Sequence, residues 1–160
     1  MKKLHNPYAE YADYSCFGCA PDNPAGLQLQ FFEDGDYIMT QWDPEQHLEG
    51  FFNVLHGGIQ ATLLDEAASW VVFVKAGTAG LTSKMNVRYK QAVKIDEGTI
   101  TVRARLMEMK RNVAVIYAEI LDAEEKICAY AHVEYFTFSP EKAKEKLYYP
   151  GLKKFLGEEH

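Results

Sequence analysis

The stretch NVLHGGIQATLLDEAASW, residues 53–70, decides the fold of this chain. A histidine and two glycines open a run that stays apolar until about Lys75, and only three strongly polar side chains interrupt it, Gln60, Asp65 and Glu66. An α-helix with apolar residues nearly all round must be buried against a broad surface. We therefore predict a long central helix here, packed against a curved β-sheet.

Alternating runs on both sides of this helix supply the strands of the sheet. Before the helix, LQLQFF (27–32) and YIMTQW (37–42) flank an Asp-Gly pair, which is a strong hairpin signal. After the breaker AGTAG (76–80), polar and apolar residues alternate as antiparallel strands require. The turns DEG, KRN and EEK join four such runs, KMNVRYKQAV (84–93), TITVRARLMEM (99–109), AVIYAEILDA (114–123) and ICAYAHVEYFTF (127–138).

The remaining segments lie at the two ends of the chain. Residues 7–15 are predicted to form a short helix or an ordered arm, and Ser139 with Pro140 opens a short helix in the charged tail, residues 139–160. With 160 residues, of which 48% are hydrophobic, the chain fits a single domain, residues 1–160, with its core at about 15–138.

Charge and composition narrow the classes of partner and location. The net charge of -6 argues against nucleic acid or an anionic membrane as the main partner. The lysines at the N-terminus precede no apolar segment of the kind found in secretory signals, and Asp65 and Glu66 interrupt the longest apolar run. Three cysteines suit a reducing compartment. We expect a cytoplasmic protein.

Three motifs together carry a family resemblance. HGGIQATLLDEA (56–67), NPAGLQL (23–29) and SKMNVRYKQAV (83–93) resemble the hotdog-fold acyl-CoA thioesterases of the PaaI-like group over roughly residues 15–138. The resemblance implies an α+β hotdog fold, in which an antiparallel sheet wraps around one long central helix, with short N- and C-terminal helical segments. It also implies hydrolysis of a small or medium acyl-CoA, or of an acyl carrier protein thioester, with no cofactor and no metal.

The helix entrance is the candidate oxyanion site. Thioester hydrolysis needs donors for the oxyanion that forms on the carbonyl oxygen. A helix N-terminus offers unpaired N–H groups and partial positive charge, and Gly57 and Gly58 have no side chain that would keep a ligand away. We predict that the Gly57 amide is the oxyanion donor, as the resemblance also implies, and that Gly58 contacts substrate.

The helix also carries the candidate base or nucleophile. Adjacent helical residues differ by about 100° in direction, so Asp65 and Glu66 cannot both face the reaction. Asp65 shares a face with Ala61, Ala68 and Val72, which suit the floor of a cleft. We assign the base or nucleophile to Asp65, as the resemblance also implies. For Glu66 we expect a contact with substrate, with a neighbouring side chain or with a helix end.

The spacing of these two residues predicts a composite site. Asp65 follows Gly57 by eight residues, which corresponds to roughly 12 Å along the helix axis. A carbonyl oxygen about 3 Å from the Gly57 amide cannot also present its carbon to Asp65 of the same helix. Two helices running antiparallel across a two-fold axis bring Gly57 of one chain to Asp65 of the other. We therefore expect a homodimer or a dimer of dimers.

Four further residues are candidates, each with an ordinary structural alternative. His56 orients or contacts the thioester, unless its ring simply caps the helix in a tight turn. The resemblance implies that Ser83 holds the attacking water, although a strand-end hydroxyl explains it equally well. Asn53 is a candidate oxyanion donor, but similar sequences carry that asparagine six positions before the histidine, where this chain has Gly50. Phe52 is a candidate substrate contact.

The cysteines and two rival functions complete the expectations. Cys16 and Cys19 form a CxxC motif, but a structural zinc site needs four ligands, and Cys128 with scattered histidines does not complete the set. We expect free, partly buried cysteines and no metal. A hotdog dehydratase acting on hydroxyacyl thioesters would need a histidine base in a different helix-entrance motif. A non-catalytic acyl-CoA sensor would keep the pocket but not the acid at position 65.

Overall fold

A computed structural model describes residues 1–158 of the chain, and its main feature is one antiparallel sheet. The strands lie in the order β1-β2-β3-β7-β8-β9-β6, and every neighbouring pair is antiparallel. The strands are β1 (Lys2–Lys3), β2 (Phe32–Asp34), β3 (Tyr37–Trp42), β6 (Gly80–Tyr89), β7 (Ile100–Lys110), β8 (Val113–Leu121) and β9 (Ile127–Thr137).

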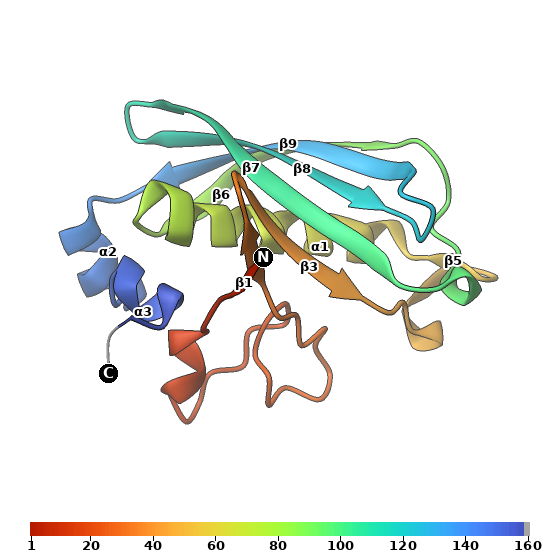
Figure 1. Cartoon of the computed structure of the whole chain (residues 1–160), viewed down its shortest axis with the longest axis horizontal. Coiled ribbons are helices and arrows are strands. Elements are labelled where there is room, and N and C mark those ends of the chain that lie inside the picture. The colour runs from red at the N-terminus through yellow and green to blue at the C-terminus, as the bar shows by residue number, and fades with distance from the viewer. Residues whose placement is uncertain (159–160) are drawn as a thin grey trace.

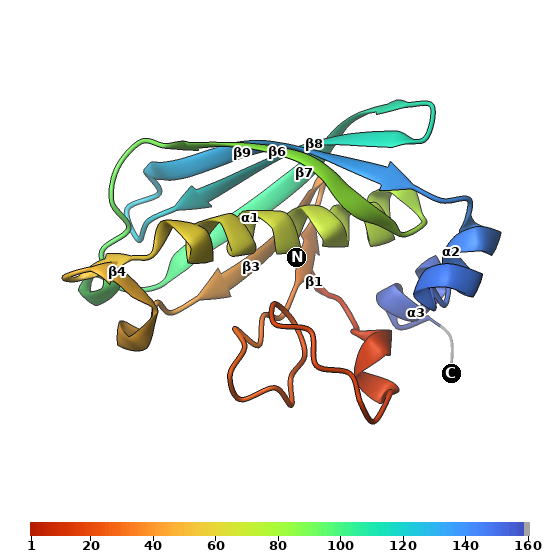
Figure 2. The ribbon, with the colours of Figure 1, turned by 180° about the vertical axis from the view of Figure 1, so that it is seen from behind.

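One long helix lies along the sheet. Helix α1 (Gly57–Val71) continues into a π-helical turn, Val72–Ala76, and ends at Gly77, whose φ of 66° is the left-handed conformation that terminates helices. The sheet curves over α1, and the N-terminal segments cover the opposite side of the helix (Figures 1 and 2). The prediction of a buried helix reaching about Lys75 is confirmed, and so is the α+β hotdog architecture.

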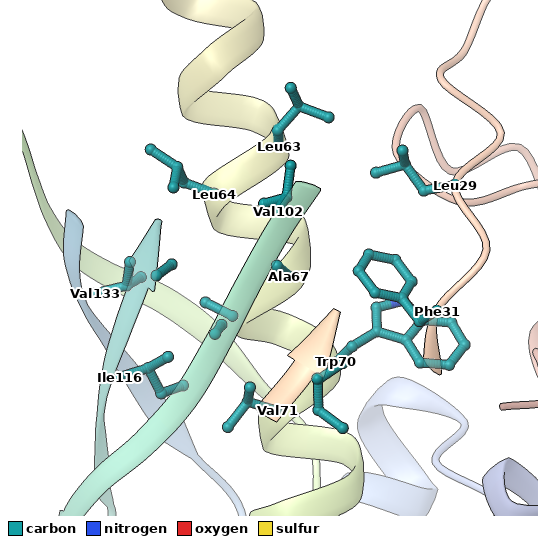
Figure 3. Close-up of a cluster of buried hydrophobic side chains, with 14 of the residues drawn as sticks. Leu29, Phe31, Leu63, Leu64, Ala67, Trp70, Val71, Val102, Ile116 and Val133 are labelled. Carbon is teal, nitrogen blue, oxygen red and sulfur yellow. The ribbon is translucent and has the colours of Figure 1, made fainter. Parts of the chain in front are cut away.

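Helix α1 is the centre of the hydrophobic core. Its fully buried side chains include Leu63, Leu64 and Val71, which pack under the sheet, as Figure 3 shows. Trp70 stacks on Phe31 with ring centroids 4.9 Å apart. Full burial of each such side chain contributes about 1.5–3 kcal/mol. These contacts hold α1 in one orientation and so determine which of its residues remain accessible.

The first predicted strand is largely wrong. The hairpin turn at Gly35 is present, but β2 begins only at Phe32. In the described part of the chain, residues 27–31 pair with no strand, and Gln28 has a left-handed backbone with a φ of 54°. Its backbone amides bond elsewhere: Leu27 donates to the Phe17 carbonyl and Leu29 to the Gly18 carbonyl. The CxxC loop thus takes the hydrogen bonds that a neighbouring strand would otherwise supply.

Strand β6 is an edge of the sheet, which the sequence did not reveal. The KRN and EEK turns do join the hairpins β7–β8 and β8–β9, but among residues 1–158 the one strand that pairs with β6 is β9. The DEG turn therefore belongs to a connection between non-adjacent strands, which contains a short 3-10 helix, Ile95–Glu97. None of the ten residues of β6 is buried. A long exposed edge of this kind presents backbone groups that can pair with a strand of another chain.

Shorter elements complete the chain. The N-terminal arm contains a 3-10 helix, and the Ser139 side chain caps α2 as predicted, by accepting a hydrogen bond from the Lys142 amide at 3.3 Å. Within residues 1–158, no helix is long and apolar enough to cross a membrane. The remaining elements are 3-10 helices Pro7–Glu10 and Gln46–Leu48, strands β4 (Glu49–Phe51) and β5 (Val54–Leu55), and helices α2 (Pro140–Leu147) and α3 (Leu152–Leu156).

Candidate functional site

The entrance of α1 is capped by a histidine ring. His56 Nδ1 accepts a hydrogen bond from the Gly58 amide at 2.9 Å, so the neutral ring carries its proton on Nε2. The capping alternative for His56 is therefore present in the structure, and it leaves an exposed N–H donor on the outer side of the ring. A Cβ atom at Gly58 would lie 3.1 Å from His56 Nδ1. The cap thus requires a small residue at position 58.

The two glycines differ in what they offer a ligand. The Gly58 amide, expected to contact substrate, is already bonded to His56 and is not a free donor. The Gly57 amide has no hydrogen-bond partner among residues 1–158, while its carbonyl accepts from the Tyr89 hydroxyl at 2.7 Å. An unpaired amide at the positive end of a helix dipole favours a negatively charged oxygen. Gly57 therefore remains the candidate oxyanion donor.

Asp65 is held by two hydroxyl groups. Its Oδ1 accepts from Thr82 Oγ1 at 2.8 Å and from the Tyr135 hydroxyl at 2.6 Å, and Tyr135 also lies 2.8 Å from the Asp65 carbonyl. Burial and the nearby Asp65 charge both raise the pKa of Tyr135, so this tyrosine stays protonated as a donor. Asp65 Oδ2 has no hydrogen-bond partner in the described part of the chain. One carboxylate oxygen is thus anchored and the other is available.

Thr82, and not Ser83, lies against this carboxylate. The Ser83 hydroxyl donates to the Glu134 carbonyl at 3.0 Å, and the pairing of β6 with β9 is irregular between Thr82 and Lys84. Successive strand side chains point to opposite faces, so only one of the two neighbours can reach α1. The assignment of Ser83 to the reaction centre is therefore corrected to Thr82, one residue earlier.

Glu66 faces a different group of side chains. Its Oε1 lies 3.6 Å from Cys16 Sγ, and Cys19 Sγ lies 3.7 Å from Cys16 Sγ. A Cβ atom at Gly18 would lie 2.4 Å from Glu66 Cδ, so the CxxC loop packs directly on this carboxyl group. Burial raises the pKa of Glu66 to about 8. The expected free cysteines are present, with Cys19 and Cys128 buried.

Two candidate substrate contacts precede the helix. Asn53 has a left-handed backbone, with a φ of 57°, and its side chain is bound to Asp96: Nδ2 donates to Oδ1 at 2.8 Å, and Oδ1 accepts from the Asp96 amide at 3.1 Å. Asn53 therefore stabilises a turn, and its side chain does not serve as a second oxyanion donor beside the Gly57 amide. Phe52 is 85% exposed at the tip of the β4–β5 hairpin, in edge-on contact with Phe51. Its role as a substrate contact stays a prediction.

The accessible groups lie along one face of α1 beside β6. Tyr89 of β6 meets the helix entrance at Gly57, and Thr82 of the same strand meets the middle of the helix at Asp65. Helix α1 faces the viewer in Figure 2. Within one chain the amide and the carboxylate are about 12 Å apart along the helix. The structure therefore brings Asp65, Thr82 and Tyr135 together, and leaves Gly57 at the other end of the face.

Known proteins share this arrangement of elements. Residues 52–129, which include α1, match the model of the thioesterase superfamily. The chain has the hotdog fold of the thioesterase superfamily. The match and the neighbours below confirm the resemblance to PaaI-like hotdog thioesterases. No curated protein sequence matches the chain at a significant level.

Solved hotdog structures resemble the chain at low sequence identity. A thioesterase superfamily protein is similar with a TM-score of 0.67 and 21% identity, and the match covers 73% of this chain but only 57% of that protein. The smu.793 protein of Streptococcus mutans, solved with acetyl-CoA, has a TM-score of 0.66, 15% identity, and coverage of 82% and 98%. The Escherichia coli PaaI protein of the phenylacetic acid degradation operon has a TM-score of 0.63, 17% identity, and coverage of 71% and 82%.

Sequence reasoning missed Tyr135, Thr82 and Tyr89. A signal existed for Tyr135, because it continues the inward-facing positions of β9 after Ala131 and Val133, where a hydroxyl needs a buried partner. No comparable signal existed for Thr82, since the irregular pairing in β6 shifts which side chains face the helix.

Proposed function

We propose that this protein is an acyl-CoA thioesterase, which hydrolyses a small or medium acyl-CoA to a carboxylic acid and free CoA. One observation carries the proposal: a half-buried carboxylate, Asp65, stands on the central helix, and two hydroxyl donors bind one of its oxygens and fix its orientation. A carboxylate on an apolar helix costs several kcal/mol unless it is paired. Here the paired oxygen is Oδ1, which leaves Oδ2 for a water proton or for the carbonyl carbon.

The roles of the groups follow from their geometry. The Gly57 amide polarises the thioester carbonyl and receives its developing negative charge. Asp65 acts as base for water or as nucleophile, and Thr82 and Tyr135 position its carboxylate. The outward Nε2–H of His56 lies beside the helix entrance and donates to the bound thioester. This assignment needs a second subunit, because the amide and the carboxylate are too far apart in one chain.

The exposed edge strand supports a homodimer. Strand β6 has ten residues, and within residues 1–158 only one of its two edges is paired, so alternate residues present backbone groups on the open edge. The strand also borders the face of α1 that holds Asp65. Two copies that pair antiparallel along β6 extend the sheet and set their α1 helices side by side. In that arrangement Gly57 of each chain approaches Asp65 of the other, and two identical sites result. Stacking of two such dimers gives a tetramer.

Other features fit an acyl-CoA substrate. Arg88 and Lys90 are exposed at the end of β6, close in sequence to Tyr89 at the helix entrance, where they can pair with CoA phosphates. Phe52 at the hairpin tip offers an apolar contact for the ligand. An acyl carrier protein thioester presents the same phosphopantetheine arm. The small number of cysteines, three in 160 residues, fits a reducing, cytoplasmic location.

Release of free thiol from a panel of acyl-CoAs tests the proposal. The wild-type chain should release thiol from at least one of them, and Asp65→Asn should reduce kcat by at least ~100-fold while the fold is retained. A sensor would bind acyl-CoA without releasing thiol, and a dehydratase would change the acyl group without releasing thiol. Either result, or unchanged turnover in D65N, would overturn the proposal.

A further inference from the structure

The group formed by Cys16, Cys19 and Glu66 has no part in the proposed hydrolysis. One sulfur or oxygen atom from each of the three residues lies within 4.8 Å of the other two. Two of the side chains come from the N-terminal loop, and the third comes from the middle of α1, about 50 positions later in the chain. Thiolate and carboxylate groups are the ligand types that a zinc ion takes from proteins.

We propose that these three side chains form a binding site for a thiophilic divalent cation, with zinc as the expected ion. The sequence supplies two ligands in a CxxC spacing, and the fold supplies the third, Glu66. The earlier expectation of no metal counted only cysteines and histidines, so it did not include a carboxylate on a distant helix. The proposal is independent of thioester hydrolysis.

The distances agree with tetrahedral coordination. With Zn–S near 2.3 Å and Zn–O near 2.0 Å, two sulfurs on one tetrahedral ion lie about 3.8 Å apart, and a sulfur and an oxygen about 3.5 Å apart. The observed separations are 3.7 Å between the two sulfurs and 3.6 Å between Cys16 Sγ and Glu66 Oε1. The third separation, between Cys19 Sγ and the Glu66 carboxylate, is at most 4.8 Å.

The surroundings of the two sulfurs stabilise negative charge. Cys16 Sγ has Cys19 Sγ as a hydrogen-bond donor at 3.7 Å, which favours negative charge on the Cys16 sulfur. The Tyr14 hydroxyl lies 3.0 Å from Cys19 Sγ and can donate to that sulfur once it ionises. Binding of the cation displaces the thiol protons of the cysteine ligands, and no electron transfer is involved.

The three ligand side chains lie at the wall of one cavity. A cavity of about 230 Å³ is lined by all three ligands and by Tyr8, Tyr14, Ser69 and Phe73. A zinc ion with three protein ligands and an open fourth position takes a water or a small ligand there. The bound ion would clamp the N-terminal loop to α1, one residue from Asp65. Its first consequence is therefore stabilisation of this loop.

Metal titration of the full-length, reduced protein tests the site. The chain is stripped with a chelator and then titrated with Zn²⁺, or with Co²⁺, whose thiolate charge-transfer absorption reports sulfur ligation. We expect one ion per chain and a zinc-dependent rise in Tm. C16S and C19S should each lose at least ~100-fold in zinc affinity. Loss of a residue that only hydrogen-bonds to a metal ligand costs ~10–100-fold, so loss of a ligand itself should cost at least as much as the upper end of that range.

Two further variants separate a metal site from general damage to the protein. E66Q should retain a Co²⁺–thiolate absorption but bind zinc more weakly, and C128S, which removes a buried thiol outside the cluster, should bind like the wild type. The proposal is overturned if the reduced wild type takes up no zinc, if E66Q binds as tightly as the wild type, or if C128S loses as much affinity as C16S. Formation of a Cys16–Cys19 disulfide by a chain that binds no zinc when reduced would overturn it as well.

Discussion

Asp65 and Glu66 are consecutive carboxylates on one helix, yet they lie in opposite kinds of surroundings. Asp65 faces β6 and β9, where two hydroxyl groups bind one of its oxygens. Glu66 faces the CxxC loop, where burial and the neighbouring Cys16 raise its pKa to about 8. The rotation of about 100° between adjacent helical residues separates the two sides. The Asp65 side thus leaves one carboxylate oxygen available for the reaction, whereas the Glu66 side brings together the three side chains of the proposed cation site.

The largest expected effect tests the Asp65 side across two subunits. Gly57→Pro replaces the amide proton at the first helical position with the proline ring. Proline is tolerated at this position, and His56 already has the extended backbone, with φ −56° and ψ 135°, that precedes proline. G57P alone and D65N alone should each lose at least ~100-fold in kcat. A 1:1 mixture of the two variants, unfolded and refolded together, should regain about a quarter of wild-type activity, because about half of the dimers are heterodimers and one of the two composite sites in each heterodimer is intact.

The control for this experiment is Gly57→Ala, which keeps the amide. Its added Cβ would lie 3.6 Å from the Tyr89 ring, an ordinary contact, so folding should be unaffected. Refolded mixtures that stay as inactive as the two single variants would contradict a site shared between subunits. If G57P alone kept wild-type activity, the Gly57 amide would have no role in the reaction.

The next effect concerns the deeper of the two hydroxyl groups on Asp65. Tyr135→Phe removes the hydrogen bonds to Oδ1 and to the Asp65 carbonyl but keeps the ring in the core. A hydrogen bond to a charged group is worth about 1.5–3 kcal/mol, so kcat should fall by ~10–100-fold. KM should change little, because Tyr135 holds the carboxylate and does not contact substrate. Tyr117→Phe, which removes a hydroxyl bound to Glu119 elsewhere on the sheet, is the matched control.

A smaller effect separates two neighbouring hydroxyls on β6. Thr82→Ala removes an exposed donor to Asp65, so kcat should fall by ~5–10-fold, near the lower end of the range for charged hydrogen bonds. Ser83→Ala removes a bond to the Glu134 carbonyl and should leave kcat within about twofold, as is usual for surface substitutions. Kinetics of the two variants side by side measure the difference. A larger loss in S83A than in T82A would restore the original assignment of Ser83.

The sequence predicted the parts of the fold that follow from periodicity. The central helix, the four long strands and the capped tail helix all came from spacing of apolar residues or from capping residues, which depend on near neighbours. The placement of β6 at an edge and the loss of residues 27–31 from the sheet depend on competition between distant segments. A local sequence pattern does not show which of the competing segments takes a place in the sheet.

The candidate site divides in the same way. The Gly57 amide and the outward-facing Asp65 were predictable because helix geometry fixes both. The error of one residue at Ser83 arose because irregular pairing after Thr82 shifts the alternation of β6. The partnership of Glu66 with Cys16 was invisible, since it joins positions 50 residues apart. Side chains fixed by their own element are predictable from sequence, and pairs between elements are not.

The smallest expected effect on turnover lies on the Glu66 side. Gly18→Ala would place a Cβ atom 2.4 Å from Glu66 Cδ, so the loop or the carboxyl group must shift. Overpacking of this kind costs about 1–3 kcal/mol, and Tm should fall measurably, while kcat should stay within about threefold because Asp65 is held from the other side of the helix. The double variant Gly18→Ala with Glu66→Ala isolates the cause. Removal of the carboxyl group should abolish most of the fall in Tm that G18A causes. Thermal unfolding of the wild type, the two single variants and the double variant measures this coupling. A G18A chain that keeps its Tm but loses most of its turnover would show that the two sides of α1 are not independent.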